Sequence, residues 1–169
     1  MRFTCVCCGN SDLICLGKIP SAINFAGRLL DSPLQGGNLF RCRSCRLVFR
    51  YPRLSKIKLD ELYCQGNENV WRSFFHLRKD WQISKHWISK YMPTSKSILD
   101  VGCSDGEFLH SHSNSHKLYG IEINPVRSEE AKKKGVQVIG SDFAAIDETS
   151  MQFDVVTSFD VIEHVHNPM

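Results

Sequence analysis

The sequence lacks any long apolar segment. Although 42% of its 169 residues are hydrophobic, no run approaches the about 20 residues with which a helix crosses a bilayer. The first residues, Met1–Cys5, also lack the apolar stretch of a secretory signal peptide. These two absences predict a cytoplasmic protein without a membrane span.

A strong excess of charge of one sign is missing as well. Lysine and arginine number 21 and aspartate and glutamate number 18, which gives a formal net charge of +3. A domain devoted to nucleic acid usually carries a marked basic excess. We therefore expect no nucleic-acid partner. The length fits one ordinary domain or two small ones and does not predict an oligomeric state.

Cysteine is abundant, with eight residues, and in a reducing compartment clustered cysteines indicate metal binding. Two Cys-x-x-Cys pairs, Cys5 with Cys8 and Cys42 with Cys45, can each bring two thiolates to one ion. Four thiolates close a tetrahedral site, so the pattern predicts a structural Zn²⁺ without an open catalytic position. Cys7 is then not needed as a zinc ligand. A redox pair and unligated buried cysteines are the alternatives.

The residue pattern divides the chain into three regions. We expect a small zinc-ribbon-like module over residues 1–53, a helical linker over residues 54–95 and an α/β domain over residues 96–169. The first region holds most of the cysteines, the second is rich in aromatic residues, and the third alternates short apolar runs with helix-like segments. No internal repeat is present.

Two helices are expected in the linker. Ser55 is a suitable N-cap for a short helix. Apolar residues at three- and four-residue steps predict a longer helix from Val70 to Met92, which Pro93 ends. Its aromatic stripe is expected to pack on a neighbouring domain, because the helical period alone explains it.

The last region predicts right-handed βαβ units and a parallel sheet with helices on both faces, which is a partial Rossmann-like fold of the α/β class. Asn124 followed by Pro125 is a typical helix start, and Gly135 a typical end. The expected strands are 97–101, 117–122, 136–139 and 153–158, and the expected helices are 106–112 and 124–135.

A glycine-rich turn follows the first of these strands. Gly102 and Gly106 allow a tight bend and a close approach of a ligand to the backbone. Glu122, at the end of the second strand, can accept hydrogen bonds from both hydroxyls of a ribose. Asp142, after the third strand, can face an adenine ring. Each carboxylate could instead be structural, as a solvated strand end or a helix cap, but their joint spacing favours a binding site.

Two other interpretations of the turn at residues 102–106 are disfavoured. It lacks the three-glycine spacing that seats a dinucleotide pyrophosphate. Its Gly-x-Ser-x-Gly sequence fits a serine-hydrolase elbow, but no suitably placed acid and histidine follow it.

Taken together, these residues resemble the class I S-adenosyl-L-methionine-dependent methyltransferases. Residues 98–106 look like the first motif of that family, and residues 153–165 are similar to its fourth; Ser104 stands where glycine is common. The resemblance implies an enzyme that binds S-adenosyl-L-methionine. The residues it implies for the cofactor are Asp100, Gly102, Cys103, Ser104, Gly106, Glu122, Ile123, Asp142, Phe143 and Phe159. It places Asp160, Glu163 and His164 near the methyl acceptor, with His164 as a candidate base.

The first region resembles the zinc-binding domain that precedes some methyltransferases, including sugar C-methyltransferases. The similar stretches are residues 16–20, 24–25 and 40–49. We therefore expect a small-molecule or sugar acceptor.

The chain stops at Met169, just after the fourth expected strand, whereas the family fold has seven. We expect either a piece of a longer protein or a truncated product with impaired activity. The alternative function is a zinc-containing binding or scaffold protein, and a third is modification of nucleic acid.

Overall fold

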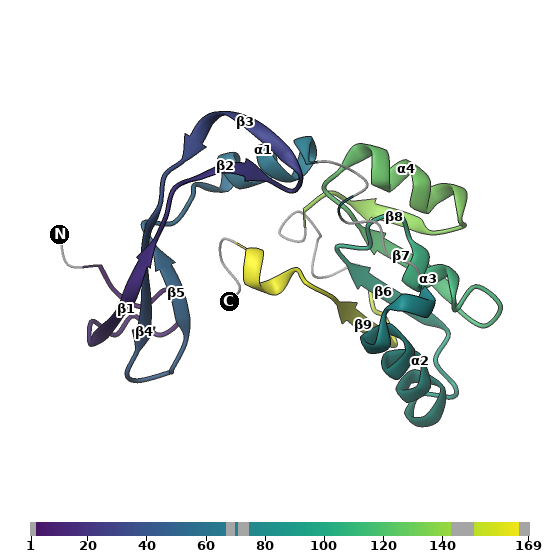
Figure 1. The fold of residues 1–169 in the computed structure, drawn as a ribbon. Helices are drawn as coiled ribbons and strands as arrows, with labels where there is room; N and C mark the ends of the chain where they lie inside the picture. The colour runs from purple at the N-terminus through teal and green to yellow at the C-terminus, as the bar shows by residue number, and fades with distance from the viewer. Residues whose placement is uncertain (1–2, 67–69, 71–74, 143–150, 166–169) are drawn as a thin grey trace. The chain divides into compact units, whose positions relative to one another are not determined.

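The computed structural model describes residues 3–66, 70, 75–142 and 151–165. The chain divides into two compact units (Figure 1). Residues 1–67 with 165–169 form the first, here called the cysteine unit, and residues 68–164 form the second, the parallel-sheet unit. The three-part division expected from the sequence stays a prediction. Among the described residues, no helix combines the length and apolar character required to cross a membrane.

The cysteine unit is built from short antiparallel strands. Strands β1, β4 and β5 form one sheet in the order β1-β4-β5, β2 and β3 form a hairpin, and α1 follows. Gly36 lies at the turn before β4, where a Cβ atom would stand 2.2 Å from the Ile19 carbonyl oxygen, so glycine is required there. The elements are β1 Leu13–Ile19, β2 Ala22–Phe25, β3 Arg28–Leu34, β4 Gly37–Cys42, β5 Val48–Tyr51 and α1 Lys56–Gln65.

The expected cap of α1 is confirmed. The Ser55 hydroxyl accepts a hydrogen bond from the Lys58 amide at 3.2 Å, which satisfies one of the free N–H groups of the first turn.

The parallel-sheet unit contains four parallel strands in the order β8-β7-β6-β9. Within this sheet, the chain passes first through β6, then through β7 to β8 at the edge. It then returns to form β9 on the other side of β6. This confirms the α/β class with a parallel sheet. The elements are η1 Phe75–Leu77, α2 Lys79–Tyr91, β6 Ser97–Val101, α3 Glu107–His110, β7 Lys117–Ile121, α4 Pro125–Lys133, β8 Gln137–Gly140, β9 Val155–Ser158 and η3 Ile162–His164.

One hydrophobic cluster joins α2, α3 and α4 to the sheet of this unit. Ile88 of α2, Leu109 of α3 and Ala131 of α4 contribute to it together with Ile98 of β6 and Leu118 of β7. Ile98, Leu109 and Ala131 are completely buried. Because this cluster fixes β6 and β7 against the helices, it also fixes the loops that leave their carboxyl ends.

The expected helix from Val70 to Met92 is wrong over residues 75–78, and its part at residues 71–74 lies outside the described residues. The α-helix starts at Lys79, after a short 3-10 turn, with Arg78 as N-cap in an extended conformation. Leu77 is 67% exposed and does not extend the buried face. The apolar residues keep their helical spacing across this break. The prediction failed there because such spacing alone does not distinguish a helix from an adjoining turn.

The two ends expected for α4 are confirmed. The Asn124 side chain accepts hydrogen bonds from the amides of Val126 and Arg127 at 3.0 and 3.2 Å, and Pro125 is the first helical residue. Gly135 follows the helix with φ of 86°, a conformation that glycine adopts without strain.

Candidate functional site

Strand β6 ends at the point where the order of the parallel strands reverses, with β7 on one side and β9 on the other. In open α/β sheets, ligands bind outside the carboxyl ends of the strands at such a point. Asp100 of β6 is 4% exposed there, and its Oδ1 accepts a hydrogen bond from the Thr157 hydroxyl of β9 at 2.7 Å. Burial raises the pKa of Asp100 to about 7. The hydrogen bond from Thr157 lowers this pKa, and the nearby charge of Glu122 raises it further.

The turn over residues 102–106, here called the glycine turn, is tied to the end of β7. The amides of Gly102 and Cys103 both donate to the Ile121 carbonyl, at 2.8 and 3.0 Å. Gly102, Ser104 and Gly106 all have positive φ, of 77°, 49° and 75°. Ser104 thus adopts a conformation that favours glycine.

Glu122 stands between the glycine turn and the start of α4. Its two carboxylate oxygens accept hydrogen bonds from the Ser104 amide at 2.8 Å and from the Asn124 amide at 2.7 Å. Burial raises the pKa of Glu122, while these backbone hydrogen bonds lower it. The carboxylate therefore couples the loops after β6 and β7 into one fixed arrangement.

A lysine supports the glycine turn from outside. The Lys134 ammonium lies 3.0 Å from an oxygen of Asp105, which is 7% exposed, and 3.1 Å from an oxygen of Glu107. These contacts form because the glycine turn brings Asp105 back over the end of α4.

Two residues expected at the cofactor have side chains in the core. Cys103 is 4% exposed, and its sulfur would lie 2.4 Å from a Cβ at Gly120. Burial also raises the pKa of its thiol. The Phe159 ring packs on Phe108 at 4.8 Å and on Trp81 at 6.3 Å between ring centroids. Contacts of Cys103 and Phe159 with a cofactor stay predictions, and this packing does not favour side-chain contacts.

The remaining cofactor candidates follow β7 and β8. Ile123 and Glu122 line one side of a surface pocket of about 420 Å³, which continues along α4 and β8. Asp142 comes two residues after the end of β8, and Phe143 lies outside the described residues. Because carboxyl ends of parallel strands meet at one edge, Asp142 belongs to the same edge as Asp100 and Glu122.

The three residues expected near the acceptor follow β9. Asp160 is exposed, with φ of 55°, and its carboxylate lies 2.9 Å from the Arg78 guanidinium. Glu163 and His164 are exposed on η3. The structure thus places them after the strand that borders Asp100, and their roles stay predictions.

Sequence reasoning missed Thr157 and Arg78 as residues of this region. Thr157 was assigned only to a strand, and Arg78 to a continuous helix. No spacing signal marks either residue, because each contact joins segments far apart in the chain.

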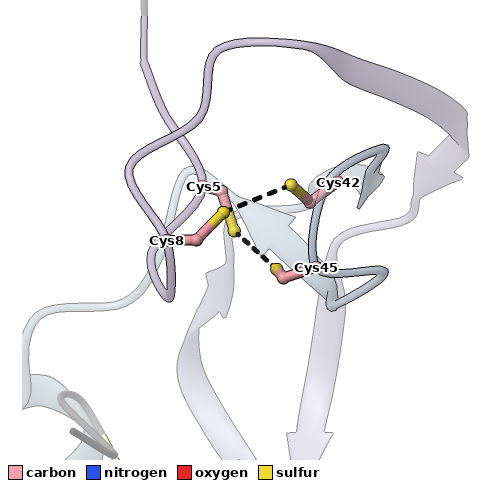
Figure 2. Close-up of side chains that lie close together, drawn as sticks. All are labelled: Cys5, Cys8, Cys42 and Cys45. Atoms are coloured by element: carbon pink, nitrogen blue, oxygen red, sulfur yellow. Dashed lines mark hydrogen bonds between the residues drawn. The ribbon is translucent and has the colours of Figure 1, made fainter.

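The cysteine unit brings together the four thiols expected to bind metal (Figure 2). The sulfur atoms of Cys5, Cys8, Cys42 and Cys45 all lie within 4.8 Å of one another. The Cys5–Cys45 and Cys8–Cys42 sulfur pairs are 3.5 and 3.6 Å apart. A tetrahedral zinc with Zn–S bonds of about 2.3 Å separates its sulfurs by about 3.8 Å, so the geometry fits this ion.

The two Cys-x-x-Cys turns share one backbone pattern. The amides of Cys5 and Cys42 donate to the carbonyls of Asn10 and Leu47, five residues on, and the carbonyls of Cys5 and Cys42 accept from the amides of Gly9 and Arg46. Gly9 and Arg46 both have positive φ, of 72° and 64°.

Thiolates placed this close together would repel one another, and the pKa values of Cys8 and Cys45 are shifted in opposite directions. A hydrogen bond from the Asn10 backbone lowers the pKa of Cys8 to about 7. A hydrogen bond from the Leu47 backbone lowers the pKa of Cys45. Desolvation and the neighbouring thiols outweigh it and raise this pKa to about 12. A divalent ion at the centre would remove this repulsion.

Comparisons with known proteins find a matching family and similar sequences. A family model described as a methyltransferase domain matches residues 73–169. Carboxy-S-adenosyl-L-methionine synthase from Campylobacter jejuni subsp. jejuni is 29% identical over 89 residues, which are 51% of this chain and 37% of that protein. The chain therefore spans little more than a third of the length of this curated relative.

Solved methyltransferase structures are similar as well. An amino pentose methyltransferase of calicheamicin biosynthesis from Micromonospora echinaspora is 19% identical, with a TM-score of 0.42, and the match covers 63% of this chain and 42% of that one. The plantazolicin methyltransferase BpumL is 22% identical, with a TM-score of 0.49, over 67% of this chain and 44% of that one.

Proposed function

The chain belongs to the methyltransferase-domain family, and from this premise we propose that its parallel-sheet unit binds S-adenosyl-L-methionine and transfers the methyl group to a small-molecule acceptor, such as a sugar. The proposal includes the three-part organisation at residues 1–53, 54–95 and 96–169.

The observation that carries the proposal is the position of Glu122. A carboxylate has about four acceptor positions on its two oxygens. Backbone amides of Ser104 and Asn124 occupy one position on each oxygen. The Ile123 backbone also contributes a hydrogen bond to this carboxylate, so about one acceptor position remains, which suits a ribose hydroxyl. Because both oxygens are already fixed, the ribose would meet a preorganised group.

Charge supports a cationic ligand beside Glu122. Asp100 is buried near Glu122, and its Oδ1 accepts a hydrogen bond from the neutral Thr157 hydroxyl. The cofactor carries positive charge on its sulfonium and its amino group, and a cation beside Asp100 would stabilise the ionised carboxylate. We place the methionine part over Gly102–Gly106. The ribose lies at Glu122 and Ile123, and the adenine at Asp142 and Phe143.

When bound, the cofactor supplies an electrophilic methyl carbon: an acceptor lone pair forms the new bond, the electrons of the C–S bond remain on sulfur, and any acceptor proton leaves to a base or to solvent. We propose Asp160, Glu163 and His164 as the residues facing the acceptor, with His164 as the candidate base. The parallel-sheet unit carries 14 acidic and 11 basic residues over 68–164. This balance disfavours a polyanionic acceptor such as nucleic acid.

The cysteine unit is proposed to hold one structural Zn²⁺ through Cys5, Cys8, Cys42 and Cys45. Four thiolates leave no open coordination position, so the ion would stabilise the fold of this unit and take no part in methyl transfer.

Calorimetric titration of the full chain with S-adenosyl-L-methionine and with S-adenosyl-L-homocysteine tests the proposal. Saturable binding is expected, with a loss of at least tenfold in affinity in Asp100→Ala and Glu122→Ala. Glu61→Ala, an exposed glutamate of α1 in the cysteine unit, is the matched control and should bind as the wild type does. Absence of binding by a folded chain would contradict the proposal and favour a zinc-containing scaffold.

A further inference from the structure

Arg78 connects the start of α2 to the segment that follows β9. Its Nε donates to one carboxylate oxygen of Asp80 at 2.9 Å, its Nη2 bonds the other oxygen, and the same Nη2 lies 2.9 Å from the Asp160 carboxylate. The guanidinium is also 5.0 Å from the centroid of the Trp81 ring. The Arg78 side chain is only 26% exposed, so its planar fork is held in one orientation.

Asp160 has a φ of 55°, in the left-handed region that most residues other than glycine, asparagine and aspartate avoid. Contacts of the side chain help to fix such a conformation. The ion pair with Arg78 is one of these contacts, because it attaches the Asp160 side chain to the start of α2.

The residues on either side of Asp160 are fixed as well. Phe159 packs against Trp81, the same ring that Arg78 contacts. Val161 lies over the glycine turn, since a Cβ built at Gly102 would be 2.3 Å from its Cγ2 atom. The position of Asp160 therefore determines how closely Val161 covers Gly102.

We propose that Arg78 is a positioning residue for the methyltransferase site: by pairing with Asp160 it holds residues 159–161 over the glycine turn and thereby shapes the space in which the cofactor binds. The inference rests on the proposed function, because it assigns the glycine turn to the cofactor. Arg78 acts through Asp160 and does not itself contact the reacting atoms.

The test is a double-mutant cycle in the full chain with Arg78→Met and Asp160→Asn, read as dissociation constants for S-adenosyl-L-homocysteine and S-adenosyl-L-methionine. Asparagine tolerates positive φ, so Asp160→Asn removes the charge and keeps the backbone. Each single change should raise the dissociation constants of both ligands about fivefold, which is the upper range for a partly exposed ion pair. The double variant should be no weaker than either single one.

Three comparisons separate positioning from other effects. Lys79→Met removes the neighbouring, exposed cation and should leave both affinities unchanged. Arg78→Lys keeps the charge without the fork and should restore part of the affinity. If Arg78 acted only through its charge, its loss would strengthen binding of the cationic S-adenosyl-L-methionine relative to the neutral product, which would overturn the inference.

Wild-type affinity in Arg78→Met, or additive losses in the double variant, would also overturn it. Absence of ligand binding by the wild-type chain would instead contradict the proposed function. Melting temperatures of all variants are measured in parallel, and a loss of affinity that only follows a loss of stability would count against positioning.

Discussion

The two units of this chain differ in the size and composition of their buried clusters. Within the described residues, the buried cluster of the cysteine unit consists of Cys5, Cys42 and Phe49, whereas that of the parallel-sheet unit contains eight residues. Two of the three in the first cluster are thiols of the four-cysteine cluster. With the proposed Zn²⁺ bound there, we expect the first unit to depend on the ion for a stable core, while the second depends on the packing of helices against a sheet.

The two units also differ in net charge. Residues 1–67 contain 10 basic and 4 acidic residues, whereas residues 68–164 contain 11 and 14. The small net charge of the whole chain hides this contrast. The basic excess belongs to the unit that would carry four thiolates, and the acidic excess belongs to the unit that would bind a cation.

Removal of metal should give the largest effect and should affect the units unequally. A structural zinc contributes on the order of 10 kcal/mol of apparent binding free energy, more than a core of this size supplies. Chelation, or Cys42→Ala, should abolish hydrogen-exchange protection in β1, β4 and β5 and leave β6 and β7 protected. Cys15→Ser changes an exposed cysteine outside the site and should behave as the wild type. Equal loss of protection in both units would contradict the comparison.

The second prediction concerns Asp100 in the parallel-sheet unit. Its pKa is about 7 when folded and near 3.8 when unfolded, so the folded chain binds the extra proton between these values. Stability contributed by this group is therefore lost as the pH rises from 4 to 7. Asp100→Asn should raise the free energy of unfolding at pH 8 by up to about 4 kcal/mol and remove this slope. Urea unfolding at pH 5 and pH 8 measures it, and an unchanged slope would contradict the burial of a charged carboxylate.

His112 should give the opposite slope in the same unit. It is 5% exposed, and burial, with the charges of Lys85 and His116 adding to the effect, lowers its pKa from 6.5 to about 4. The unfolded chain then binds more protons between pH 4 and 6.5, so stability falls as the pH falls through this window. The full loss is on the order of 3 kcal/mol.

His112→Phe keeps an aromatic ring beside Phe108 and should remove the acid-side slope. Unfolding experiments from pH 4 to 7 in the Asp100→Asn background isolate the effect. Persistence of the slope in the double variant would assign it to other groups.

The two units also differ in what the sequence could predict. The grouping of the four cysteines was predicted from spacing alone, because a Cys-x-x-Cys turn is a local feature, and it is confirmed by their clustered sulfur atoms. The parallel sheet was identified because its apolar strands alternate with capped helices such as that beginning at Asn124. The antiparallel strands β1 to β5 were not predicted, since exposed residues interrupt their apolar pattern.

The candidate site was predictable only where its residues follow their own strands. Glu122 and the glycine turn have this property. The contact of Thr157 with Asp100 depends on β9 lying beside β6, and strand order is not written in local spacing. The pairing of Arg78 with Asp160 joins a helix start to a distant loop. Both contacts require the complete topology.

The smallest predicted effect lies within the cysteine unit and compares its two turns. Gly9 and Arg46 occupy equivalent positions with positive φ, but only one of them is glycine. Among the residues that the structure describes, no atom beyond the immediate chain neighbours lies within 4 Å of a Cβ at Gly9, so Gly9→Ala introduces backbone strain without a clash. Gly9→Ala should lower the free energy of unfolding by about 1 kcal/mol. Arg46→Gly should raise it by somewhat less, because glycine also increases the conformational entropy of the unfolded chain. Chelator concentrations at half-unfolding measure both variants. Changes of the same sign would show that the two turns are not equivalent, and that their shared hydrogen bonds do not impose one backbone requirement.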